Sequence, residues 1–301
     1  MEGIRTGWDL HVHSTRSDGR YSAAELIGIL AENGIGRAAI VDHDTLWGYR
    51  DGIIPAKSAG IELIPGMEIS TWYTPGRLEE IVEFDRHPNK NRGEEIHILW
   101  YGMDVDDAGV RAFEEEIRRM QNERAKKIVD GLLRQGYRLD FELMEAVSSP
   151  APVGVPPMIM QMIERGYLPL VLEAIREFVL NNIGPGGAAY QPPALDMRVA
   201  AKRARDLGGV VVVAHPGKIK SADALSTLLS LASGIEAAYP IHTAEQTAQY
   251  INEGKDRGMF FTGGTDFHGY YESGYVRFEF PEGYERELER FAAACGHHTS
   301  A

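Results

Sequence analysis

Seven short runs of β-forming residues alternate with helix-like segments over most of the 301-residue chain. Two of the helical segments open on a capping-box pattern, in which Ser22 is followed by Glu25 and Thr243 by Gln246. Alternation of this kind is typical of a parallel sheet whose strands are joined by helices. The pattern therefore predicts an α/β fold in the form of a parallel barrel. The seven runs are residues 8–13, 37–44, 61–70, 95–104, 208–216, 233–240 and 258–268.

The middle of the chain departs from this alternation. Between residues 107 and 135 apolar residues recur at helical spacing, and further helical runs follow up to residue 182 without a strand candidate. A segment rich in glycine and proline comes next, before the alternation resumes. We predict that residues 104–195 form an inserted α-helical subdomain between the two parts of the barrel, residues 1–103 and 196–301.

Composition restricts the class of protein. Apolar residues make up 44% and charged residues 25% of the chain, as in soluble globular proteins. No apolar run is long enough to cross a bilayer and the N-terminus lacks the core of a signal peptide, which favours a cytoplasmic protein without a membrane partner. A net charge of -13 argues against binding to duplex DNA but is compatible with small phosphorylated substrates. The single cysteine, Cys295, excludes a cysteine-rich metal site, so any metal must be held by His, Asp or Glu.

Histidine and acidic residues gather near the ends of the predicted strands. His11 and His13 are two residues apart, so both imidazoles point to the same face of a strand. In parallel barrels the C-terminal ends of the strands meet on one face, where active sites are built. The other candidates are His43 closing the second run, Glu68 closing the third, His97 in the fourth, His215 at the end of the fifth, and Asp266 with His268 at the end of the last.

This combination of residue types indicates a metal centre. Imidazole and carboxylate ligands without thiolate suit manganese, iron or zinc. The candidates outnumber the ligands of one ion, which points to two or three divalent ions sharing a bridging carboxylate, and Glu68 is the candidate bridge. Such ions activate water and clamp the oxygens of an in-line displacement, so hydrolysis of a phosphate ester is the natural reaction. A hydrogen-bonded core histidine is the alternative role for His97 and His215.

At these positions the sequence resembles the PHP (polymerase and histidinol phosphatase) family of metal-dependent phosphoesterases. The resemblance is strongest to the branch with an inserted helical domain that dephosphorylates nucleoside 5′-phosphates and 3′,5′-bisphosphates. It implies a distorted (β/α)7 barrel with three metal ions. The matching segments, in family order, are DLHVHSTRSDG, AAIVDHDTLWG, LIPGMEIST, EIHILWYGMDV, AYQPPALDMRVAAKRARDLGGVVVVAHPGK and GTDFHG.

The resemblance also implies how the ligands are shared. One ion would be held by His11, His13, Glu68 and Asp266, a second by Glu68, His97 and His215, and a third by Asp18, His43 and His268. Asp18 enters the set only through the resemblance, and a turn residue before Gly19 is its alternative role. The residues expected to take part directly in catalysis are Asp18, His43, His215, Asp266 and His268.

Two departures from the family concern the substrate. Relatives carry a Thr-Arg-Pro-His segment in the insert, suited to a substrate phosphate, where this chain has Gly154-Val155-Pro156-Pro157. The loop 74–95 is long and highly charged, and it is predicted to be either a lid over the site or a solvated excursion. Lys218, after the last residue of the HPG turn, is the predicted phosphate contact, with a solvated lysine as the alternative.

The sequence therefore predicts an enzyme. The favoured reading is a phosphoric monoester hydrolase that acts on a nucleotide-like substrate, a 5′-mononucleotide or a 3′,5′-bisphosphate, by a metal-activated hydroxide. Within phosphate chemistry the alternatives are a histidinol-phosphate-type phosphatase and a 5′-exonuclease for short RNA. Outside it they are an amidohydrolase that cleaves C–N bonds and a non-catalytic protein that binds metal or nucleotide.

Overall fold

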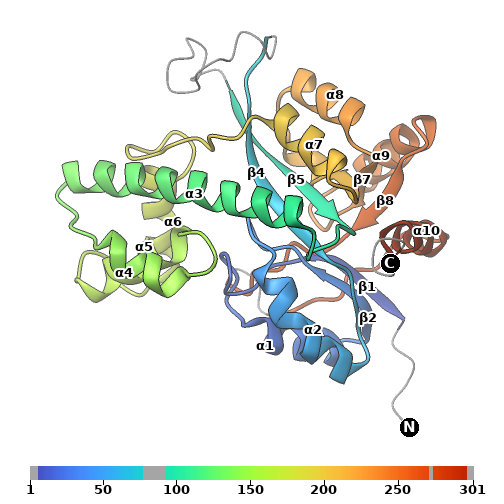
Figure 1. The fold of residues 1–301 in the computed structure, drawn as a ribbon, viewed down its shortest axis with the longest axis horizontal. Helices are drawn as coiled ribbons and strands as arrows, with labels where there is room; N and C mark the ends of the chain where they lie inside the picture. Colours follow the sequence, from blue (N-terminus) through green and yellow to red (C-terminus); the bar gives the residue numbers. More distant parts are fainter. Residues whose placement is uncertain (1–5, 77–92, 271–273, 297–301) are drawn as a thin grey trace.

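Two sheets lie at the centre of the computed structural model, which describes residues 6–76, 93–270 and 274–296 (Figure 1). The first sheet is parallel and has the order β1 (Gly7–Val12), β2 (Ile35–Ile40), β3 (Glu62–Leu63). The second has the order β4 (Gly66–Tyr73), β5 (Glu94–Tyr101), β6 (Val210–Val213), β7 (Gly234–Ala238), β8 (Phe260–Gly263). The α/β class predicted from the sequence is confirmed.

The predicted closed, all-parallel barrel of seven strands is not what the described strands form. β5 runs antiparallel to both of its neighbours, β4 and β6. The third predicted strand is two strands, β3 and β4, because Pro65 between them has no N–H to donate to a ladder. Isolated parallel bridges from Val12 to Phe267 and from His43 to Glu68 join the two sheets, so their edges still meet on one side.

Helices cover the outer faces of the two sheets. Both capping boxes predicted from the sequence are present, with the side chains of Ser22 and Thr243 accepting from the backbone of Glu25 and Gln246. Tyr101 lies fully buried in the main core, and its hydroxyl donates to the carbonyl of Leu10 across 2.7 Å, which ties the second sheet to the first. The covering helices are α1 (Ala23–Glu32), α2 (Trp47–Ala59), α7 (Met197–Asp206), α8 (Ala222–Leu231), α9 (Ala244–Asp256) and α10 (Glu285–Gly296).

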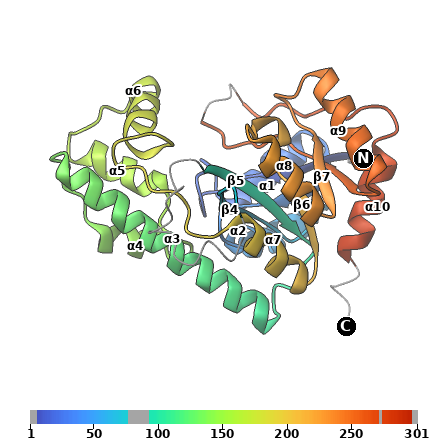
Figure 2. The same ribbon diagram turned by 90° about the horizontal axis from the view of Figure 1, so that it is seen from above.

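The segment between β5 and α7 is helical and extends to one side of the sheets (Figure 2). It contains α3 (Ala108–Arg134), α4 (Phe141–Ser148), α5 (Val155–Glu164), α6 (Leu172–Phe178) and the π-turn Val179–Ile183. Phe113 in the first half of α3 packs in the core of the sheets, whereas Leu132 near its end packs in a separate hydrophobic cluster with α4 and α5. One helix thus joins two cores. None of the described helices is both long and apolar enough to span a bilayer.

Candidate metal centre

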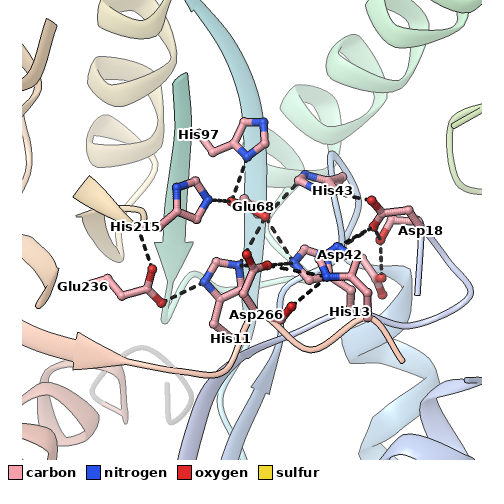
Figure 3. Close-up of polar contacts among 12 residues, drawn as sticks. His11, His13, Asp18, Asp42, His43, Glu68, His97, His215, Glu236 and Asp266 are labelled. Atoms are coloured by element: carbon pink, nitrogen blue, oxygen red, sulfur yellow. Dashed lines mark hydrogen bonds and ion pairs between the residues drawn. The ribbon is translucent and has the colours of Figure 1, made fainter. Parts of the chain in front are cut away.

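The joined edges of the two sheets carry a cluster of imidazoles and carboxylates (Figure 3). All nine sequence-predicted ligands lie in it: His11, His13, Asp18, His43, Glu68, His97, His215, Asp266 and His268. The prediction that Glu68 closes its strand is wrong, because it is the third residue of β4, which continues for five residues beyond it. His97 on β5 lies beside Glu68, because the antiparallel register pairs His97 with Ser70, which is on the same face of β4 as Glu68.

Glu68 is the centre of the cluster, and its side chain is 1% exposed. Its Oε2 lies 3.3 Å from His11 Nε2, 3.2 Å from His13 Nε2 and 3.4 Å from His43 Nδ1. Its Oε1 lies 3.0 Å from His97 Nδ1 and 2.9 Å from His215 Nε2. Burial alone would raise the pKa of Glu68, but the neighbouring imidazoles outweigh it and hold the pKa well below the usual range. One ionised carboxylate therefore faces five imidazoles.

Asp266 forms the first possible metal-binding group together with His11, His13 and Glu68. Its Oδ1 lies 3.3 Å from the Nε2 atoms of both His11 and His13, and these rings also face Glu68. Four atoms held tetrahedrally at about 2.0–2.1 Å from one ion lie roughly 3.3 Å apart, so the observed separations fit a divalent ion.

The open side of the cluster is formed around Asp18, whose side chain is 36% exposed. Its Oδ1 lies 3.2 Å from His268 Nε2, and its Oδ2 lies 3.8 Å from His43 Nε2. These three residues form a second possible group with His13, and His43, Glu68 and His97 form a third. The turn that carries Asp18 requires Gly19, because a Cβ there would lie 2.1 Å from the carbonyl oxygen of His13.

Several buried ring nitrogens have no hydrogen-bond partner among the described residues. They are both ring nitrogens of His13, Nδ1 of His43 and Nδ1 of His215. A buried polar atom without a partner costs about 1–3 kcal/mol, and native structures keep such atoms rare. Nε2 of His13 and Nδ1 of His43 face the ionised Glu68 carboxylate without a hydrogen bond, as metal ligands do, so the donor set fits divalent ions.

The backbone is strained at two of these residues. His215 and Asp266 have positive φ angles of 26° and 55°, although neither is glycine. Such conformations cost of order 1–3 kcal/mol and cluster at functional sites. The strain turns both side chains toward Glu68 from the ends of β6 and β8.

A second layer of residues holds the ligands in place. Glu236 on β7 is fully buried, and its Oε1 accepts from His11 Nδ1 at 2.8 Å while its Oε2 accepts from the backbone N–H of His215 at 2.7 Å. The first bond leaves Nε2 of His11 free to face Glu68. Tyr239 was not predicted from the sequence, although it directly follows β7. Its hydroxyl donates to Asp266 Oδ2 at 2.8 Å, which leaves Oδ1 for the cluster.

We expect Glu236→Gln to weaken metal binding by roughly 10- to 100-fold. The amide can accept one of the two hydrogen bonds that Glu236 accepts, but its NH2 group then faces the other donor, either His11 Nδ1–H or the His215 N–H. The measurement is the dissociation constant for Mn²⁺ by competition with a chelator. The same substitution at the exposed Glu32 is the control and should leave the constant unchanged; equal affinities in both variants would contradict a role for Glu236 behind the ligands.

Lys218 lies at the rim of the cluster. Its Nζ is 2.8 Å from Asp266 Oδ2, and its side chain is 47% exposed. The structure therefore places the sequence-predicted phosphate contact next to a predicted metal ligand. Residues 77–92, most of the loop predicted as a lid, lie outside the described residues.

The chain is similar to known proteins over most of its length. The family model of the PHP domain matches residues 9–167, more than half of the chain. A phosphoribosyl 1,2-cyclic phosphate 1,2-diphosphodiesterase of Eggerthella lenta is 26% identical over 264 residues, which cover 87% of this chain and 94% of that protein. A 3′,5′-nucleoside bisphosphate phosphatase of Chromobacterium violaceum is 25% identical over 273 residues, 88% of each chain.

Two further matches extend this result. A 5′-3′ exoribonuclease of Haemophilus influenzae is 26% identical over 268 residues, 87% of this chain and 89% of that protein. A crystal structure from Bifidobacterium adolescentis, provisionally described as a metal-dependent phosphoesterase, superposes with a TM-score of 0.75 at 20% identity and covers 96% of each chain. This last likeness concerns the fold.

Proposed function

Because this chain belongs to the PHP domain family, we propose that it is a metal-dependent phosphoesterase that hydrolyses a phosphate monoester of a nucleotide-like substrate. The observation that supports the proposal most is the environment of Glu68, a buried, ionised carboxylate with five imidazole nitrogens within 3.4 Å. A structural role for Glu68 explains neither the number of imidazoles nor the unpartnered nitrogens of His13 and His43 that face it.

The proposed ligands are the eight residues of the three groups and His215, which lies 2.9 Å from Glu68. Two or three divalent ions, of manganese, iron or zinc, would be held by the nine residues named above, with Glu68 shared between ions. When bound, such ions activate water and neutralise the charge on the phosphoryl oxygens. Lys218 adds a cation at the rim, where it can contact a phosphate oxygen.

The remaining steps belong to residues of the chain. Asp18 and His268, paired at the open side, would hold an ion there, and the oxygen of the leaving group would depart beside it and take its proton from water. The geometry of the reacting phosphate would be fixed by a rigid ligand set that includes His43, His215 and Asp266. Glu236 orients His215, and Tyr239 orients Asp266.

The substrate class follows from the relatives. The matched proteins are named for a cyclic phosphate of phosphoribose, nucleoside bisphosphates and RNA, all of which join a phosphate to a ribose or nucleoside. We propose a 5′-mononucleotide or a 3′,5′-bisphosphate as the substrate; short 5′-phosphorylated RNA and histidinol phosphate are the alternatives. With a net charge of -13, duplex DNA is not among the proposed partners.

The test is phosphate release by protein loaded with Mn²⁺. The panel consists of 5′-mononucleotides, 3′,5′-bisphosphates, cyclic nucleotides, short 5′-phosphorylated RNA and histidinol phosphate, with a set of amides beside them. Release from a nucleotide class is the expected result. Cleavage of amides instead would assign C–N bond chemistry, and metal binding without any turnover would overturn the enzyme.

We expect Lys218→Met to raise KM for the preferred phosphate ester by about tenfold, because a hydrogen bond to a charged group contributes ~1.5 kcal/mol at the lower end of its range. The value of kcat should change less, since the lysine contacts the phosphate in both the ground and the transition state. Lys220→Met, an exposed neighbour, is the control. A fall in kcat at unchanged KM would mean that Lys218 acts on Asp266 rather than on the substrate.

A further inference from the structure

A recess of about 270 Å³ opens between the metal centre and the helical segment. Asp18, His43 and His97 form its inner side, so a body attached to a phosphate at the centre can extend into it. The opposite side comes from α3, from the segment that leads into α5 and from the π-turn. This segment lies close to the turn that carries Asp18, since a Cβ on Gly154 would be 3.8 Å from the carbonyl oxygen of Ser17.

The wall away from the metal centre is apolar. Its side chains come from segments far apart in the sequence, and they are Ala125, Ile128, Val153, Val155, Met158, Val179 and Ile183. Most are buried and pack in the hydrophobic cluster of the helical segment, while Val155 and Val179 are half-buried. Such a wall is suited to an apolar or aromatic group and offers nothing to a charge.

The fixed charges of the recess are unfavourable to an anion. Arg124 is the one lysine or arginine among the described lining residues, and its guanidinium is already held by Glu95 at 3.2 Å and by the carbonyl of Gln191 at 2.8 Å. Glu95, Asp44 and Asp18 also line the recess. A second phosphate placed here would meet the carboxylates of Glu95 and Asp44, which are not among the proposed metal ligands, and a cation whose charge is already offset.

Helix α5 begins at the recess and offers few N–H groups to an anion. The first four N–H groups of a helix have no partner within it and commonly bind phosphate. In α5 the second and third residues are Pro156 and Pro157, which have no N–H, and Gly154 at the N-cap has no side chain. Two of the four donors are therefore missing.

We propose that this recess receives the uncharged body of a substrate that carries a single phosphate, and that it discriminates against a second phosphate on that body. The inference rests on the proposed phosphoesterase function and narrows it to monophosphates over bisphosphates and oligonucleotides. A cation placed on the apolar wall should then create the missing partner and relax the discrimination.

The experiment compares kcat/KM for adenosine 5′-monophosphate and adenosine 3′,5′-bisphosphate with the Mn²⁺-loaded full chain. The expected ratio favours the monophosphate by about tenfold or more, because a buried charge without a partner is costly. Val155→Lys should shift the ratio toward the bisphosphate by about tenfold, whereas Val155→Met, of similar length, should not. Met160→Lys adds the same charge on α5, at a side chain that is 53% exposed and outside the lining, and should leave the ratio unchanged.

The outcomes separate the two proposals. If the unmodified protein hydrolyses both esters equally well or prefers the bisphosphate, the role of the recess is wrong while the phosphoesterase function stands. The same holds if Val155→Lys, folded by circular dichroism, leaves the ratio unchanged. Should that variant not fold, the test is repeated at Val179 on the other side of the recess, with Val179→Lys as the variant and Val179→Met as its control. If neither ester, nor any other of the panel, releases phosphate, the proposed function itself is overturned.

Discussion

Replacing Glu68 with glutamine is expected to remove the metal ions and phosphate release together. The substitution keeps the shape of the side chain but gives it a single acceptor oxygen and an NH2 group, where two ionised oxygens now face five imidazole nitrogens. An NH2 group cannot act as a ligand, so a bridge between ions is lost. Substitution of residues behind metal ligands typically lowers metal affinity or activity by roughly 10- to 100-fold. Loss of a ligand should have a larger effect, so we expect kcat/KM to fall by more than about a hundredfold.

Two measurements test this prediction, the metal content of the protein and its phosphate release. The metal content per chain, by mass spectrometry, should fall in Glu68→Gln and stay unchanged in Glu32→Gln, the same substitution at an exposed site. Phosphate release should fall in parallel with the metal content and should not be restored by excess Mn²⁺. A variant that keeps its full metal content and near-normal turnover would show that Glu68 is an ordinary buried carboxylate, and the proposed centre would fail with it.

The sequence could predict which residues gather at the metal centre, because strand periodicity and position at the ends of strands are visible in the sequence itself. His11 near the end of β1 and His13 just after it share a face through the two-residue period of a strand, and Asp266 and His268 lie three and five residues beyond the end of β8. Their convergence needed only that the edges of the strands meet on one side, which holds for two joined sheets as well as for a closed barrel.

The sequence could not predict the direction of β5, although it contained a sign of it. His97 lies near the start of its strand, where a ligand in a parallel barrel would be out of place. In the antiparallel strand the start lies at the same edge as the ends of β6 and β8, so the position of His97 becomes the expected one.

The residues behind the ligands could not be assigned from the sequence, because their role depends on burial, which the sequence does not show. Glu236 could equally have formed a structural ion pair, and its role follows from the 2.8 Å bond to His11 across 225 positions of the chain. The recess beside the centre is even less accessible from sequence, because Ile128, Val153 and Ile183 come from three segments that only the packing of the helices brings together.

Removal of the metal ions is expected to abolish activity and to destabilise the protein most strongly at alkaline pH. Without bound ions, burial lowers the pKa of His13, but its contacts with Asp266 and Glu68 outweigh that effect and raise the pKa to about 10. Burial likewise lowers the pKa of His97, and Glu68 and Glu95 raise it to about 10. At pH 7.5 both imidazoles are therefore protonated in the metal-free protein, whereas a metal ligand must be neutral.

The direction of the pH effect follows from these values. A histidine whose pKa is raised by folding stabilises the metal-free protein fully below the unfolded value near 6.5, and this contribution is lost as the pH rises toward 10. The metal-bound protein gains nothing from these protons, so the drop in Tm caused by a chelator should be larger at pH 9 than at pH 6.5.

The same protonation predicts what happens when the ions return. Loading with Mn²⁺ at pH 7.5 must displace the protons of His13 and His97, so we expect release of at least two protons per chain, measured by calorimetry in two buffers of different ionisation enthalpy. The release should decline as the pH rises through 10, because both rings then lose their protons without metal. Metal uptake without proton release at pH 7.5, or an equal drop in Tm at both pH values, would mean that the two imidazoles do not give up protons to ions at this centre.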